Sequence, residues 1–125
     1  MNTKINVQLL LKVADQISKT PEQFDMRFWD CGAVACIAGW TLRLSKVRVL
    51  KNCEIEVVDK AMSRLGISCQ ADAGTLFLEP KWPAQFRFST WDNATDQASK
   101  AVKRIHAFLD EHAPGWRDEP TNFQR

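Results

Sequence analysis

The stretch that decides the fold spans residues 32–45 and reads GAVACIAGWTLRLS. It does not alternate between apolar and polar residues, as a half-buried strand would. Ala35 and Gly39 lie four residues apart and would share one face of a helix, where small side chains let a second backbone approach closely. A glycine inside a helix costs about 1 kcal/mol relative to alanine, and close packing can offset that cost. We therefore predict a buried helix over residues 32–45.

Helical periodicity recurs on both sides of this stretch. Apolar residues repeat at steps of three and four in three segments, which are residues 6–19, 54–65 and 94–112. A shorter helix is predicted over residues 69–78, with Ser68 as its N-terminal cap. A single helical turn is predicted to follow Thr20, because Pro21 suits the first position of a helix. The pattern therefore predicts about five helices.

The remaining segments connect these helices. Residues 46–50 alternate charged and aliphatic side chains and could form one short strand pair or an extended link. A segment with two prolines and several aromatic residues is predicted to form a loop before the last helix. We predict an all-α fold, with a single helical domain over residues 1–113. Residues 114–125 are expected to form a loosely held C-terminal tail, apart from Trp116.

The composition limits the classes of function. The chain has 125 residues, of which 45% are hydrophobic and 26% charged, as in ordinary globular domains. Its formal net charge of +2 is too small to imply a nucleic-acid or membrane partner. Because we find neither a signal peptide nor an apolar run that could span a bilayer, we expect a cytoplasmic protein with reduced cysteines. No cofactor motif is evident, and the oligomeric state is left open.

The cysteines are the first candidates for chemistry, and they are Cys31, Cys36, Cys53 and Cys69. Structural zinc sites usually place two ligands on a tight knuckle, whereas the closest pair here is five residues apart and the other two stand alone. We therefore predict no metal site. Free cysteine is among the most buried residue types and packs as a small hydrophobe. We accordingly predict a tightly packed core formed by Trp29, Ala35, Cys36, Gly39 and Trp40.

Cysteine catalysis is the alternative interpretation of the same stretch. Cys31 would precede a helix N-terminus, where backbone N–H groups and the helix dipole favour a thiolate. His106 and His112 are the candidate bases, provided that one of them lies within hydrogen-bond reach of the thiol. The segment DCGAVACIAG resembles the nucleophile segment of bacteriocin-processing cysteine peptidases, which implies Cys31 as nucleophile. The glutamine that this family places six residues earlier is Asp25 here.

A second resemblance covers more of the chain, in the segments FDMRFWDCGAVACIAGW, SRLGISCQADAGTLFLEPKWP and ASKAVKRIHAFL. These are similar to a group of small bacterial and phage-associated proteins. The shared pattern is a Cys-Gly…Cys-x-Ala-Gly-Trp core, a later Leu-Phe…Trp-Pro segment and a closing Ala-rich helix. That group often has a threonine where this chain has Ala33. The resemblance implies a coherent domain and no particular activity.

Two further segments are candidates for contact with a partner. The first is basic and contains Arg43, Lys46, Arg48 and Lys51. It could touch phosphates, but the acidic residues that follow it favour an ordinary solvated surface. The second is the predicted loop, with the aromatic residues Trp82, Phe86 and Phe88. These rings would mark a partner groove if they were exposed, or they would anchor the loop to the core.

Our leading hypothesis is a non-enzymatic macromolecular-interaction module with an unidentified protein partner. It rests on the lack of a complete catalytic set, a cofactor motif or a membrane segment in the sequence. The alternative is a cysteine hydrolase with Cys31 as the nucleophile. A weak nucleic-acid binder that uses the basic segment at residues 43–51 ranks third.

Overall fold

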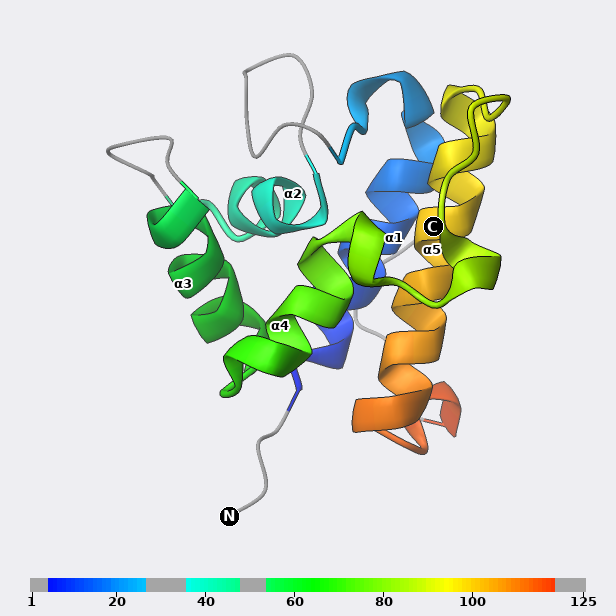
Figure 1. Cartoon of the computed structure of the whole chain (residues 1–125). Coiled ribbons are helices and arrows are strands. Elements are labelled where there is room, and N and C mark those ends of the chain that lie inside the picture. Colours follow the sequence, from blue (N-terminus) through cyan, green and yellow to red (C-terminus); the bar gives the residue numbers. More distant parts are fainter. Residues whose placement is uncertain (1–4, 27–35, 48–53, 119–125) are drawn as a thin grey trace.

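The structure is a computed structural model that describes residues 5–26, 36–47 and 54–118 (Figure 1). Within these ranges the chain forms five α-helices, which are α1 (Val7–Lys19), α2 (Ile37–Leu44), α3 (Glu54–Leu65), α4 (Gln70–Phe77) and α5 (Ala94–His112). Short 3-10 turns connect them, namely η1 (Pro21–Gln23), η2 (Glu79–Lys81), η3 (Ala84–Phe86) and η4 (Trp116–Asp118). The described ranges contain no strand, and no helix in them is long and apolar enough to cross a membrane. The prediction of an all-α fold is confirmed.

Helices α1 and α5 lie side by side and run antiparallel (Figure 1). Both are amphipathic, and their apolar faces meet in the core. Five of the side chains on these faces are fully buried, namely Leu10, Val13, Ile17, Ile105 and Phe108. Burial of one side chain of this size contributes about 1.5–3 kcal/mol to stability. The pairing of the two longest helices is therefore a major source of the stability of the domain.

Asn6 joins the start of α1 to the end of α3. Its side-chain oxygen caps α1 by accepting a hydrogen bond from the Leu9 backbone N–H at 3.1 Å. Its side-chain amide donates to the Arg64 carbonyl at 3.2 Å, and its backbone N–H donates to the Leu65 carbonyl at 2.8 Å. Helix α3 ends here because Gly66 adopts a φ of 77°, in the left-handed region that favours glycine. One asparagine thus sets the relative position of two helices.

Helix α2 packs against α1, α3 and α4, and every residue from Ile37 to Leu42 is buried. We predicted that this helix begins near Gly32, but its first residue is Ile37. Cys36 has an extended backbone with a ψ of −173°, so it is the N-cap rather than a residue inside the helix. The prediction of the helix start was wrong because small and apolar residues favour burial without marking where the first turn begins.

Three of the predicted core residues can be placed in the structure. Cys36 is 1% exposed, and Gly39 and Trp40 are buried on α2. The Trp40 indole N–H donates to the Gln23 carbonyl at 3.1 Å, which ties α2 to the turn η1. The other two residues of the predicted core, Trp29 and Ala35, lie outside the described residues.

Helix α2 ends in a compact turn at the position where a strand pair was predicted over residues 46–50. Lys46 adopts a φ of 59°, and its N–H donates to the Arg43 carbonyl at 3.2 Å. The Val47 N–H donates to the Leu42 carbonyl at 2.9 Å. This pattern is a Schellman motif, which satisfies the last carbonyls of a helix. Lys46 and Val47 therefore close α2, and the rest of the predicted pair lies outside the described residues.

Two predictions in the second half of the chain need correction or refinement. The N-cap of α4 is Cys69 rather than Ser68, and the Cys69 side chain makes no capping hydrogen bond. Beyond α5, Trp116 is only 7% exposed, and its indole N–H donates to the Asp110 carboxylate at 2.7 Å. This hydrogen bond lowers the pKa of the Asp110 carboxyl. The turn η4 is thus anchored to α5, and residues 119–125 lie outside the description.

Candidate functional site: a cationic groove between α1, α2 and α3

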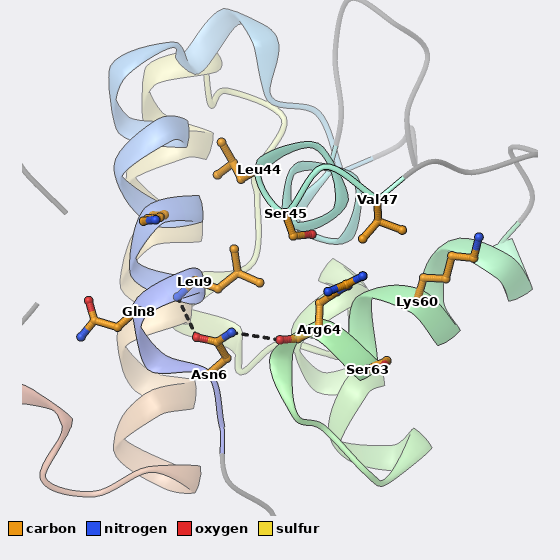
Figure 2. Close-up of a pocket in the computed structure, with 10 residues that line it drawn as sticks. Asn6, Gln8, Leu9, Leu44, Ser45, Val47, Lys60, Ser63 and Arg64 are labelled. Carbon is orange, nitrogen blue, oxygen red and sulfur yellow. Dashed lines mark hydrogen bonds between the residues drawn. The ribbon is translucent and has the colours of Figure 1, made fainter. Parts of the chain in front are cut away.

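An open groove of about 640 Å³ lies between α1, the C-terminal end of α2 and α3 (Figure 2). Asn6 lies at the point where α1 and α3 meet, and its two side-chain hydrogen bonds are drawn in Figure 2. The turn that closes α2 forms the third wall, through Leu44, Ser45 and Val47. The Ser45 hydroxyl donates to the Thr41 carbonyl at 2.7 Å, which helps to hold this turn. Hydrogen bonds thus hold the turn at the end of α2 and the junction of α1 with α3, which both border the groove.

The groove carries positive charge from two helices. Lys12 on α1 and Lys60 and Arg64 on α3 line it, and none of its lining residues in the described ranges is acidic. The Lys60 ammonium lies 3.2 Å from the Glu56 carboxylate one turn away on α3. Figure 2 shows the Arg64 side chain rising from α3 toward the turn at Ser45. Cations clustered without a lining carboxylate create a positive potential that attracts acidic groups.

The groove also has an aliphatic part. Leu9 is 8% exposed, whereas Leu44 and Val47 are half-buried and pack against the hydrophobic core. No aromatic side chain is among the described residues that line the groove. The site can therefore bury aliphatic groups of a ligand beside its charges, but it offers no ring on which a nucleobase could stack.

The predicted basic segment contributes to this region only in part. Lys46 is exposed at the end of α2, between Ser45 and Val47, which line the groove. The Arg43 guanidinium lies over the Trp40 ring at 4.7 Å, so its position is set by a cation–π contact. Arg48 and Lys51 lie outside the described residues. Our reading of the sequence missed Lys12, Lys60 and Arg64, because only the fold brings α1 and α3 together.

Of the candidates for cysteine catalysis, the structure describes His106 and His112, whereas Cys31 lies outside the described residues. His106 packs against the Trp116 ring at 5.2 Å and faces the α1 side of α5, beside Val102. The His112 ring lies 4.3 Å from the Phe108 ring, and its Nδ1 is 4.0 Å from the Asp72 carboxylate. The two histidines therefore lie on different faces of α5.

Metal binding finds no support in the part of the chain that the structure describes. There, no group of three His, Cys, Asp or Glu side chains is placed to hold an ion. Cys36 is buried and Cys69 is exposed. Cys31 and Cys53 lie outside the described residues.

The aromatic loop before α5 packs inward. Trp82 is 3% exposed, and its indole N–H donates to the Leu76 carbonyl at 3.0 Å. Phe88 meets the rings of Trp82 and Phe24 edge-on, at centroid distances of 5.4 and 6.4 Å, and Phe86 is half-buried. The buried Trp82 cannot be part of an exposed partner surface, and these rings anchor the loop to the core.

Among the described residues, Trp91 is the large hydrophobic side chain that is exposed, at 91%. It lies at the turn just before α5, beyond the aromatic residues that we singled out in the sequence. The polar residues Ser89, Thr90, Asp92 and Asn93 surround it in the sequence. These polar neighbours could have indicated from the sequence that Trp91 is exposed, because such residues are typical of turns.

Comparison with known proteins adds no further assignment. No family model, no curated protein and no solved structure matches this chain. The resemblances to bacteriocin-processing cysteine peptidases and to small bacterial and phage-associated proteins therefore stay predictions. The case for a function rests on the geometry of the groove.

Proposed function

We propose that this domain is a protein-interaction module whose groove between α1, α2 and α3 binds an acidic segment of a partner protein. The observation that carries the proposal is that Lys12, Lys60 and Arg64 line a groove with an aliphatic floor, and that none of its described lining residues is acidic. Arg64 is exposed, and its guanidinium has no ion-pair partner within the described residues. A partner carboxylate could therefore pair with it without first breaking an internal salt bridge.

The floor of the groove favours a peptide over a nucleic acid. Leu9, Leu44 and Val47 can bury apolar side chains, at about 25 cal/mol for each Å² removed from water. Single-stranded nucleic acids gain much of their affinity from stacking on aromatic rings, and the described lining has none. The net charge of +2 also argues against a protein adapted to polyphosphates. An acidic, amphipathic peptide segment would pair its carboxylates with the cations of the groove and bury its apolar side chains on the aliphatic floor.

The expected affinity is modest and depends on salt. An exposed ion pair contributes about 0.2–1 kcal/mol, so three such pairs cannot hold a partner tightly without the aliphatic contacts. The charges would mainly accelerate and orient the encounter. Aliphatic contacts would then set the lifetime of the complex.

The test is a binding titration of the purified protein with a fluorescent peptide of alternating Leu and Glu, compared with duplex DNA and single-stranded RNA. The double variant Lys12→Glu and Arg64→Glu should lower the affinity for the peptide about tenfold or more. Lys103→Glu, at an exposed position on α5, is the matched control and should bind like the unmodified protein. Val47→Ser, in the floor, should weaken peptide binding without a change in charge.

Two results would contradict the proposal. The first is equal peptide affinity for the unmodified protein and the double charge variant. The second is tighter binding of DNA or RNA that Val47→Ser leaves unchanged, which would assign the groove to nucleic acid instead. Circular dichroism of each variant confirms that a loss of binding does not come from a loss of fold.

A further inference from the structure

A second cavity, of about 450 Å³, opens on the other side of the domain between α4, the loop that follows it and α5. Arg104 of α5 lines this cavity, although its side chain is only 2% exposed. A buried guanidinium is costly unless its donors are well paired. The position of the buried Arg104 guanidinium at the wall of a cavity therefore calls for a physical explanation.

The pairing of Arg104 is incomplete. Its Nε donates to the Thr75 carbonyl at 3.0 Å, and its Nη1 reaches the Glu111 carboxylate at the long distance of 3.4 Å. Glu111 is itself 56% exposed, so water weakens this ion pair. Nη2 has no hydrogen-bond acceptor within the described residues. Every fully buried side-chain nitrogen or oxygen in these residues does have a hydrogen-bond partner, so Nη2 is not fully buried. Nη2 must therefore keep some contact with open space, and Arg104 is one of the residues that line the cavity.

The charges around the cavity restrict the anion that could pair with Nη2. Lys81 adds one positive charge to that of Arg104, whereas Asp72 and Glu111 add two negative charges. The His112 imidazole, 4.0 Å from the Asp72 carboxylate, also lines the cavity. These four charges sum to zero, so a ligand with a single negative charge disturbs the balance less than a dianion such as phosphate does, and its carboxylate can accept a charge-assisted hydrogen bond from Nη2. The charge pattern therefore favours a ligand with a single negative charge.

The apolar part of the lining is rigid. Trp82 forms one side of the cavity, and its indole is held by the hydrogen bond to the Leu76 carbonyl. Pro83 follows directly and adds a second apolar surface. A flat aromatic or aliphatic group could rest on these two residues while its carboxylate reaches Arg104. This combination of an apolar wall and a few convergent polar groups is typical of small-molecule sites.

We propose that this cavity binds a small organic carboxylate, with the carboxylate on Nη2 of Arg104 and the apolar group against Trp82 and Pro83. This site is separate from the groove of the proposed function, and the two share no lining residue. Binding would complete the pairing of a buried cation and thereby stabilise the folded state.

The experiment is an NMR titration of the full chain with phenylacetate, with inorganic phosphate and phenylethylamine as comparison compounds. Phenylacetate should shift the Trp82 indole N–H and the Arg104 Nε–H resonances, while the other two compounds shift them less. Arg104→Lys keeps the charge but loses the fork, and it should weaken binding about tenfold. Glu111→Gln removes a competing partner at an exposed position and should strengthen binding about threefold or more. Glu22→Gln, in the exposed turn η1, is the matched control and should leave binding unchanged.

Three outcomes would overturn the inference. In the first, phenylacetate moves neither resonance at concentrations up to about 10 mM. In the second, phosphate binds more tightly than phenylacetate, which would reject the monocarboxylate. In the third, Glu111→Gln leaves the affinity unchanged or lowers it. Because Glu111 is exposed, this last variant folds and keeps the inference falsifiable even if Arg104→Lys does not fold.

Discussion

Helices α2 and α4 have the same length, eight residues, but very different surroundings. All residues from Ile37 to Leu42 are buried in α2, whereas α4 buries only Ala73, Leu76 and Phe77. Helices this short are not stable alone in water, because the first turn costs more conformational entropy than its hydrogen bonds return. The comparison teaches that tertiary packing on several sides stabilises α2, and packing on one face is sufficient for α4.

The two short helices also differ from α1 and α5 in their N-caps. Each begins after a cysteine N-cap, Cys36 or Cys69, that makes no side-chain capping hydrogen bond. By contrast, Asn6 caps α1, and Asn93 forms a full capping box with Asp96 at the start of α5. The long helices therefore combine local stabilisation with packing, whereas the short ones depend on packing. Four measurements can break or sharpen this contrast.

The largest expected difference concerns the two N-cap thiols. Cys36 is 1% exposed and should react with an alkylating reagent only when the domain unfolds, whereas Cys69 is exposed and should react directly. In the native protein we expect Cys36 to react about a thousandfold more slowly, given the stability of ordinary domains. Mass spectrometry of the labelled peptides measures both rates. Rapid labelling of Cys36 under native conditions would show that α2 is not buried as described.

The second effect is on global stability. Ile37 in α2 is fully buried, so Ile37→Ala should lower the free energy of unfolding by about 2–5 kcal/mol. Gln70→Ala, at the exposed first position of α4, should change it by less than about 0.5 kcal/mol. Urea denaturation of both variants provides the comparison. Equal losses would mean that the two short helices do not differ in the way their burial indicates.

A smaller effect is expected from capping α4. Cys69→Asp places a carboxylate at an exposed N-cap that has no side-chain hydrogen bond, and should raise the free energy of unfolding by about 1 kcal/mol. Asn93→Ala, which removes the capping box of α5, should lower it by a similar amount, about 0.5–2 kcal/mol. Thermal unfolding followed by circular dichroism measures both. A loss of stability in Cys69→Asp would show that the start of α4 cannot accept a cap.

The smallest expected effect is a dependence of stability on pH, which arises from the Asp92 carboxyl near the start of α5. The Lys100 ammonium, 2.6 Å from the Asp92 carboxylate, and the Ser89 backbone N–H lower the pKa of this carboxyl below its ordinary value. The ionised form is therefore favoured in the folded state. The contribution of the ionised Asp92 carboxyl to the free energy of unfolding is complete above its ordinary pKa, and it is lost as the pH falls through the lowered pKa.

Asp92→Asn should remove this contribution and flatten the decline of stability that sets in as the pH falls below the ordinary pKa of an aspartate carboxyl, about 3.9. The difference should disappear once both proteins are studied below the lowered pKa. Urea denaturation at a series of pH values measures it. Parallel curves for the two proteins would show that the Asp92–Lys100 contact does not persist in solution.

The sequence predicted the long elements well because their periodicity is strong. The expected helices over residues 6–19, 54–65 and 94–112 correspond to α1, α3 and α5 with changes of at most one residue at any end. The start of α2 was missed because GAVACIAGW carries no polar cap that marks a first turn. Its boundary depends on how the surrounding helices pack, which local composition does not encode.

The candidate sites were harder to predict than the helices. The groove collects Lys12 from α1 and Arg64 from α3, which are distant in the sequence and meet through the hydrogen bonds of Asn6. Arg104 looks in the sequence like one more exposed cation on an amphipathic helix, yet its side chain is buried beside Thr75. Neither environment follows from the neighbours of these residues along the chain.

The sequence by itself determined the all-α class, the register of the long helices and the positions of their apolar faces. These features depend on a repeat of three and four residues and on turn-forming residues, which act over short distances. Only the tertiary structure decided that Trp82 is buried while Trp91 is exposed, and that Lys12 shares a groove with Arg64. Burial and electrostatic surroundings depend on residues far away in the chain, which become neighbours only when the helices pack.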